Sequence, residues 1–227
     1  MKTLIKFALP LAGAALTAAP AFAQDFAQGL AGPPRPPVGA SPNQAIPERD
    51  SFGRYATPNQ DLSSEETVWH LRAALNVAAL ACRDAEEAET IAAYGHMLAQ
   101  DGAPLAAADA AVKARYRARY GPAWADRHDR DMTRLYNFFA QPTAQAGFCV
   151  AAHHVLAEVG QVAPEQLSGF AAEALPRLEA PFTDFYRDYD RYRAALAAWR
   201  EQRMPAEQAP DAPLTIETAS TAGMALP

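Results

Sequence analysis

Several sequence patterns that mark enzyme classes are missing from this chain of 227 residues. It has no Gly-x-Ser-x-Gly, which argues against the nucleophile turn of the α/β-hydrolases. It has no Glu-x-x-His, the signature of the carboxylate-bridged dimetal sites of helical bundles, and no Cys-x-x-Cys-His for covalent c-type haem. We therefore predict no catalytic residue, no metal site and no cofactor.

Long apolar runs are also missing after Ala23, so we expect no membrane span, which would need roughly 20 such residues. The first 23 residues have a different pattern, with two lysines, an apolar run and the Ala-x-Ala cleavage motif Ala21-Phe22-Ala23. This pattern is typical of a secretory signal peptide over residues 1–23. We predict a periplasmic or secreted protein that begins near Gln24 after cleavage.

An excess of basic residues is the third absence. The net charge is −6, and removal of the two lysines of the signal peptide makes it −8. An acidic chain outside the cytoplasm argues against nucleic acid and against a coat on anionic lipid. The partners we expect are an envelope protein or a small anionic ligand.

No stretch shows the period-2 alternation of strands, whereas apolar residues recur at three- and four-residue steps. We predict an all-α fold, an antiparallel bundle of five to seven helices, over residues 62–203. A capping box at Ser63-Ser64-Glu65-Glu66 opens it. The expected helices cover 64–83, 84–100, 104–120, a segment that begins at Pro122, 142–159 and 164–203, the last broken or kinked by Pro176 and Pro181.

The two flanks of this region differ from it in composition. Residues 24–61 are rich in proline, glycine and small residues, with PPRPPVG at their centre. Such a segment buries too little apolar surface to offset its ordering entropy. We predict a disordered linker there, or a docking peptide for a proline-reading partner, and a disordered tail over residues 204–227.

The chain has only two cysteines, and both lie on apolar helical faces. In an oxidising compartment Cys82 and Cys149 are expected to form one disulfide between helices that are distant in sequence. The alternative is a redox-active pair, but such cysteines usually lie close together in sequence.

One helical face combines aromatic residues with two polar ones. At 100° per residue, His128 and Asp131 fall into the same sector as Trp124, Leu135 and Phe139. A histidine and a carboxylate at i,i+3 resemble an oriented pair that could move a proton. The other interpretation is a buried hydrogen-bonded pair that fixes the helix register.

Two further polar residues interrupt an apolar face of the first helix. Arg72 and Asn76 lie between its apolar positions, where they could hydrogen-bond inside the bundle or line a cleft. We assign them, with His128 and Asp131, to a possible ligand or polar site.

The stretch from 113 to 121 is basic in an otherwise acidic chain. On a helix its four cations form two stripes, so only half of them can face one surface. The stripes pair Lys113 with Arg117 and Arg115 with Arg119. They are either a patch for an anionic envelope component or acidic partner, or a solvated face.

The last helix carries a seam of large apolar residues over residues 182–199, spaced 3, 4, 3, 4, 3. This seam predicts packing along another helix, within the chain or in a homodimer. Taken together, the patterns favour an exported binding or interaction protein of the cell envelope. The alternatives are a small-ligand-binding protein or a hydrolase that uses the His128–Asp131 pair.

Overall fold

The computed structural model describes residues 32–41 and 43–203. The predicted signal peptide and the predicted tail after Arg203 lie outside these residues. The chain divides into two units, Met1–Pro34 and Arg35–Pro227, and nearly all of the described residues belong to the second.

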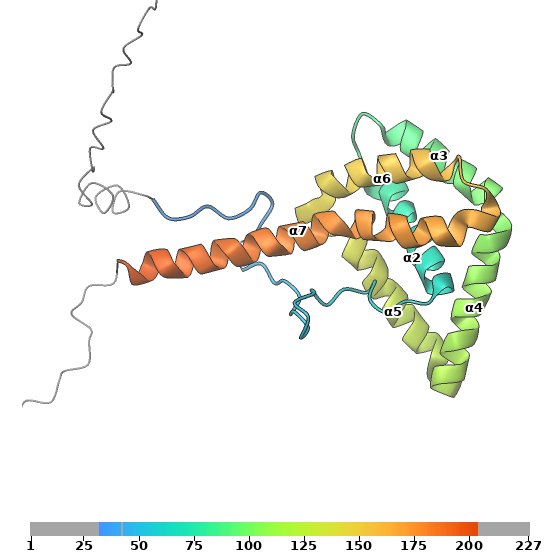
Figure 1. Ribbon diagram of the computed structural model, residues 1–227, viewed down its shortest axis with the longest axis horizontal. Helices are drawn as coiled ribbons and strands as arrows, with labels where there is room; N and C mark the ends of the chain where they lie inside the picture. The colour runs from blue at the N-terminus through green and yellow to red at the C-terminus, as the bar shows by residue number, and fades with distance from the viewer. Residues whose placement is uncertain (1–31, 42, 204–227) are drawn as a thin grey trace, which may run out of the picture. The chain divides into compact units, whose positions relative to one another are not determined.

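The second unit is helical, as Figure 1 shows. Its α-helices are α2 (Ser64–Ala81), α3 (Glu87–Gln100), α4 (Gly102–Tyr120), α5 (Trp124–Phe139), α6 (Gln145–Val159) and α7 (Leu167–Glu201). Short 3-10 turns precede α5, α6 and α7. Across residues 32–41 and 43–203 there is no strand, only an isolated bridge between Arg49 and Tyr55. The all-α prediction is confirmed for this part of the chain.

The start of α2 follows from its sequence. Ser63 Oγ accepts a hydrogen bond from the Glu66 backbone N–H (3.3 Å), and Glu66 Oε2 accepts one from the Ser63 backbone N–H (2.9 Å). The predicted capping box is thus present. It fixes the first turn of the helix around which the others pack.

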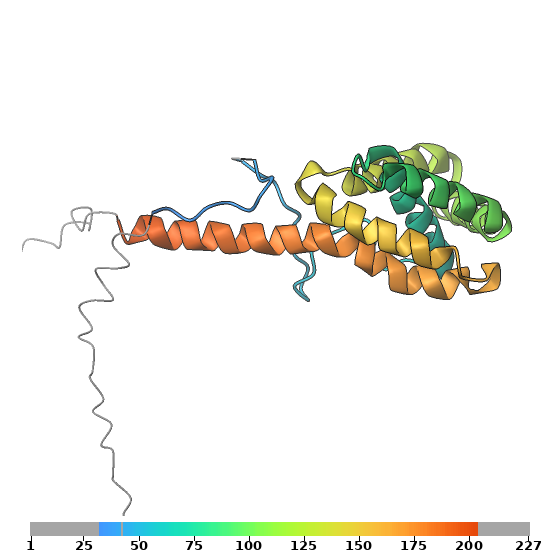
Figure 2. The same ribbon diagram turned by 90° about the horizontal axis from the view of Figure 1, so that it is seen from above.

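The helices do not line up along one axis. In Figure 1, α4 and α5 run steeply across the direction of α7, while α6 lies beside α7 in both views (Figure 2). The reason lies in α2, where Ala73, Ala74, Leu75 and Ala78 are fully buried, so that partners approach it from several sides. An antiparallel bundle of five to seven helices is therefore not the arrangement seen.

α7 runs through both of its prolines, so of the predicted break or kink the break does not occur. Pro176 lies on an exposed position, as does residue 172, so the carbonyl that loses its helical N–H partner is available to water. Pro181 packs closely against Gly147 of α6. A Cβ atom added to Gly147 would lie only 3.2 Å from the Cβ atom of Pro181. Large buried side chains on either side, among them Leu178 and Phe182, hold the helix in place.

The apolar seam predicted over residues 182–199 of α7 packs in large part against the core of the same chain. Phe182, Phe185 and Tyr189 are buried in the core, whereas Tyr192 is only partly buried. A homodimer through residues 182–199 would therefore have only the part after Tyr189 to use. None of the described helices has the length and apolar character that a membrane crossing requires.

Residues 43–62 form what we call the N-terminal strap, which packs on α7. Tyr55 is 6% exposed, and its ring meets that of Tyr186 edge-on at 5.3 Å between centroids. The Tyr55 hydroxyl donates to Asp190 Oδ2 (2.7 Å), and Arg49 pairs with the same oxygen at 2.9 Å. Over residues 43–61 this order differs from the predicted disordered linker, whose residues 24–31 lie outside the described part of the chain. A few anchoring side chains offset the composition that favours disorder.

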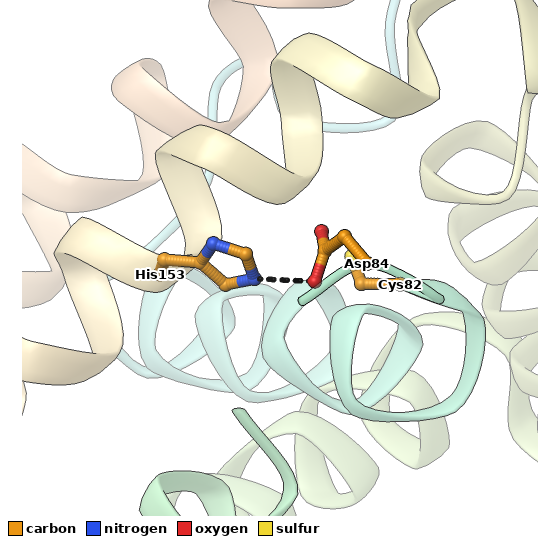
Figure 3. A group of neighbouring side chains, drawn as sticks. All are labelled: Cys82, Asp84 and His153. Carbon is orange, nitrogen blue, oxygen red and sulfur yellow. Dashed lines mark ion pairs between the residues drawn. The ribbon is translucent and has the colours of Figure 1, made fainter. Parts of the chain in front are cut away.

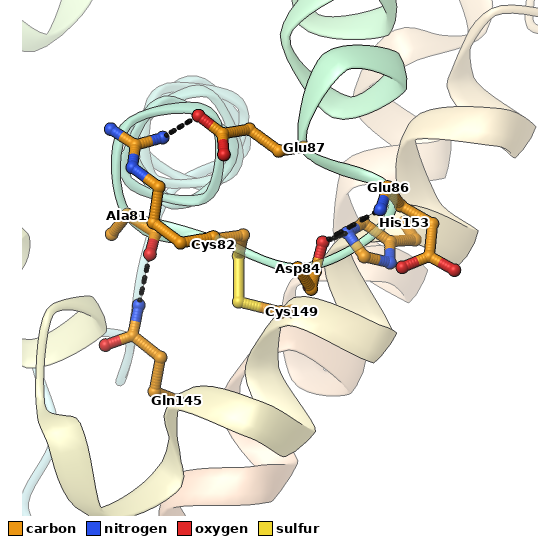
Figure 4. Close-up of a disulfide and its surroundings, with 9 residues drawn as sticks. Ala81, Cys82, Asp84, Glu86, Glu87, Gln145, Cys149 and His153 are labelled. Carbon is orange, nitrogen blue, oxygen red and sulfur yellow. Dashed lines mark hydrogen bonds and ion pairs between the residues drawn. A yellow bond between two sulfur atoms is a disulfide. The ribbon is translucent and has the colours of Figure 1, made fainter.

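The predicted disulfide is confirmed between Cys82, directly after α2, and Cys149 of α6, as Figure 4 shows. The Cα atoms are 5.7 Å apart, and the cysteines are 1% and 4% exposed. Gln145 supports the same junction by donating from Nε2 to the Ala81 carbonyl (3.1 Å). The two cysteines are 67 residues apart in sequence, and their bond links the end of α2 to α6.

Candidate functional site

A cleft of about 900 Å³ opens between α2, α4, α5 and the N-terminal strap. Charged and aromatic side chains from the three helices form much of its lining, and the strap adds apolar ones. They are Glu66 and His70 of α2; Arg115, Tyr116, Arg119 and Tyr120 of α4; Arg127, Asp131, Met132, Arg134, Asn137 and Phe138 of α5; Ala45, Ile46, Pro47, Ala56, Thr57, Pro58 and Leu62 of the strap; and Gln141 and Tyr186.

Four arginines are the most distinctive part of this lining. Arg115 and Arg119 are one turn apart on α4, and Arg127 and Arg134 are seven residues apart on α5, so each pair shares a helix face. The turn that brings the two helices together contains Gly121, whose φ of 51° favours glycine. Local sequence thus determines both the spacing on each helix and the turn between them.

Asp131 organises one side of the cleft. Its Oδ2 accepts hydrogen bonds from Arg127 Nε (3.0 Å) and the Tyr116 hydroxyl (3.1 Å), and its Oδ1 accepts one from Arg134 (3.3 Å). Burial raises the pKa of Tyr116, and the negative charge of Asp131 raises it further, so the hydroxyl stays protonated and donates. The carboxylate thereby orients two guanidinium groups.

The positive charge of the cleft is only partly balanced. Glu66 lies 3.4 Å from Arg115, and Asp131 contacts two other arginines. Glu66 and Asp131 are the only carboxylates among the described lining residues, against four guanidinium groups. Arg119 lies over the Tyr120 ring, 5.3 Å from its centroid. The cleft is therefore a cationic site on an acidic protein.

His70 adds a neutral polar group. Its ring is 7% exposed, and its Nδ1 donates to Asn59 Oδ1 of the strap over 2.9 Å. Burial lowers the pKa of His70 to about 4, against a smaller opposing effect of Glu66. The imidazole is therefore uncharged at neutral pH. With Nδ1 as donor, Nε2 remains an acceptor.

The predicted His128–Asp131 pair does not form in the described part of the chain. The His128 ring packs edge-on against Tyr116 with centroids 5.1 Å apart, and its Nδ1 lies 3.7 Å from Asp129. Its Nε2 is buried without a hydrogen-bond partner among the described residues. Asp131 lines the cleft, whereas His128 is not among its lining residues. The two share a sector of the helix but contact different neighbours.

Arg72 and Asn76 belong to a different region from the cleft. Arg72 stacks over the Trp69 ring, 4.7 Å from its centroid. Burial raises the pKa of the Tyr94 hydroxyl, while Arg72 and Asn76 act in the opposite direction. The four predicted site residues are therefore not brought together.

The basic stretch divides as its helical spacing predicts. Arg115 and Arg119 line the cleft. Lys113 pairs with Asp109 at 2.7 Å, and Arg117 stacks on Trp124 at 4.3 Å from the ring centroid. One stripe thus meets the candidate site, and the other is engaged by side chains outside it.

The sequence analysis named Asp131 of α5 but not Arg127 and Arg134, and it named no residue of the strap. Arg127, Asp131 and Arg134 are spaced i,i+4 and i,i+3, a signal of paired charges that was available in the sequence. The His70–Asn59 contact had no such signal, because it joins α2 to a segment whose composition favours disorder.

A group with metal-ligating atoms lies beside the disulfide. Sγ of Cys82, a carboxylate oxygen of Asp84 and a ring nitrogen of His153 all lie within 4.8 Å of one another. Figure 3 shows the three side chains at the junction. While Cys82 is bonded to Cys149, its sulfur is not a thiolate and is no metal ligand.

No protein-family model, no curated protein and no solved structure matches the chain.

Proposed function

We propose that this chain is an exported binding protein whose cleft takes a small anionic molecule with an aromatic or apolar body. The observation that carries this proposal is the set of four arginines around one cleft of about 900 Å³. That volume falls within the roughly 300–1,000 Å³ of small-molecule sites.

Arginine is suited to this task because its planar guanidinium donates two parallel hydrogen bonds to a phosphate or carboxylate. The side chains of Arg115, Arg127 and Arg134 are 51%, 41% and 68% exposed, so a ligand can reach them. Asp131 engages only one N–H each of Arg127 and Arg134, which leaves further donors on both. An anion would balance the excess positive charge.

The rest of the lining indicates what accompanies the anionic group. The partly buried Tyr120 presents aromatic surface, and the partly buried Met132 and Ile46 present aliphatic surface. Apolar surface removed from water here would favour a ligand with a hydrophobic body. Phosphate or sulfate alone would leave this surface uncovered.

Two alternatives receive less support. A hydrolase needs His128 and Asp131 to act together, and no hydrogen bond or ion pair joins these described residues. An interaction protein needs a surface that a partner would cover, and the large exposed apolar residues of the described part of the chain, which include Val38, Leu80 and Val150, belong to different elements with no one element carrying a continuous apolar face among them.

Calorimetric titration with phenyl phosphate tests the proposal, with inorganic phosphate and phenol as partial ligands. We expect phenyl phosphate to bind more tightly than either. Arg119→Gln should weaken its binding by about fivefold, which corresponds to about 1 kcal/mol. Arg130→Gln, at an exposed position of α5 outside the cleft, should leave the affinity unchanged.

Equal affinities of the two variants would contradict the assignment of the cleft. Equal binding of phosphate and phenyl phosphate would contradict the role of the apolar surface. Failure of all three compounds to bind would contradict the proposed ligand class.

A further inference from the structure

The junction between the end of α2 and α6 holds a second set of functional groups, separate from the arginine cleft. Cys82, Asp84 and His153 already place a sulfur, an oxygen and a nitrogen within 4.8 Å of one another (Figure 3). Cys149 adds a second sulfur at the same point, since it is bonded to Cys82 (Figure 4). Two sulfurs, an imidazole and a carboxylate are a donor set that suits tetrahedral Zn²⁺.

His153 supplies an independent observation. Its Nε2 is buried and has no hydrogen-bond partner among the described residues. The nearest acidic atom, Asp84 Oδ1, is 3.6 Å away, which is beyond ordinary hydrogen-bond length. A buried nitrogen without a partner requires an explanation, and a cation that binds there is one. The adjacent His154 is exposed and belongs to a different face of α6.

The oxidation state of the cysteines decides whether the site exists. A dithiol reductant that donates two electrons converts the Cys82–Cys149 bond into two thiols and itself becomes a disulfide. Each thiol then releases one proton as it binds a divalent cation, because the thiolate is the ligand. Zinc and the disulfide are therefore mutually exclusive.

We propose that the reduced chain binds one Zn²⁺ through Cys82, Cys149 and His153, with Asp84 as the fourth ligand. The cysteine Cα atoms are 5.7 Å apart, so two thiolates can meet one ion after a rotation of their side chains. At Zn–S distances of about 2.3 Å, the two sulfurs would lie roughly 3.8 Å apart. Zinc would then replace the disulfide as the link between α2 and α6.

This role would matter when the chain is folded but its cysteines are not oxidised. Both cysteines are almost completely buried, so a metal bound there would shield the thiolates from solvent. The cross-link between the two helices would persist in either redox state. The proposal does not depend on the anion-binding cleft.

Cobalt is the most direct probe, because tetrahedral thiolate-bound Co²⁺ has a distinctive visible absorption. The full chain is reduced with dithiothreitol, and the dithiothreitol is removed under anaerobic conditions. The reduced chain is then titrated with Co²⁺ and afterwards with Zn²⁺. We expect one Co²⁺ per chain, displacement by one Zn²⁺, and no absorption from the oxidised chain. Zinc should also raise the melting temperature of the reduced chain only.

His153→Ala should lower the Zn²⁺ affinity of the reduced chain at least tenfold, and His154→Ala should not change it. Circular dichroism of both variants in the oxidised state checks that they fold. The proposal is overturned if the reduced chain binds no stoichiometric metal, or if both variants bind as tightly as the parent. Binding without a rise in melting temperature would also overturn it, because the ligands would then be thiols of an unfolded chain.

Discussion

Burial of a single residue, His70, links the stability of the fold to pH. Its pKa is about 4 in the folded chain, below the roughly 6.5 of an unperturbed histidine. The unfolded chain therefore binds more protons between these values, and stability falls as the pH falls from 6.5 to 4. The difference between these two pKa values corresponds to roughly 3 kcal/mol of stability, lost in full below pH 4.

Urea unfolding between pH 4 and 7.5 measures this effect. His70→Gln should flatten the pH dependence by up to roughly 3 kcal/mol, whereas His154→Gln, at an exposed position, should leave it unchanged. Identical slopes for the parent and His70→Gln would show that His70 titrates normally.

The His128–Asp131 case shows what a helical wheel does and does not determine at the residue scale. Both residues, which the spacing places in one sector of the helix, contact Tyr116. Helical spacing does not determine which neighbouring residue each side chain contacts. Asp131 is engaged by two arginines of its own helix, at i−4 and i+3, and by a tyrosine of α4. Charge-assisted hydrogen bonds to arginine are stronger than hydrogen bonds between neutral groups, which accounts for the partners of Asp131.

At the scale of elements, the N-terminal strap is part of the fold, and Tyr55 is its main anchor. Tyr55→Ala removes a buried ring and the hydrogen bond to Asp190. We expect a loss of about 3 kcal/mol in the free energy of unfolding, by analogy with other buried aromatic residues. Phe52→Ala, three residues away and 83% exposed, is the matched control and should cost less than about 0.5 kcal/mol.

Denaturant unfolding of the two variants distinguishes an ordered strap from a disordered linker. If the segment were disordered, neither substitution would affect the stability of the chain. Equal midpoints for Tyr55→Ala and the parent would therefore contradict the packing described above.

The disulfide is the second link between elements. Closing a loop between residues 67 apart in sequence should stabilise the fold by about 4 kcal/mol through restriction of the unfolded chain. Urea unfolding of the oxidised and reduced chain, both with a chelator, should show this difference. Two cysteines that react with an alkylating reagent before reduction would contradict the bond.

At the scale of the whole molecule, sequence periodicity predicts the helices better than their arrangement. The Ser63 cap and the period of α2 locate its start, and the two cysteines identify one contact between distant helices. The arrangement of the helices could not be predicted, because the small residues of α2, such as Ala74 and Ala78, let other helices pack against it from several sides. Nothing in one helix specifies those directions.

The cleft was only partly predictable for the same reason. The Arg115–Arg119 stripe is visible in the sequence as a possible anion site. Its partners Arg127 and Arg134 reach it only because α4 and α5 meet at Gly121. The site is therefore a property of the packed chain, assembled from three helices and the strap.

The most direct test of the anion-binding cleft is an NMR titration of the methionine methyl groups with phenyl phosphate. Met132 lines the cleft, whereas Met97 is buried in α3 away from it. We predict a saturable shift of the Met132 methyl signal, from the ring current of the bound ligand, and no shift of Met97. Saturable binding that leaves the Met132 signal unmoved would place the ligand elsewhere and contradict the proposed cleft.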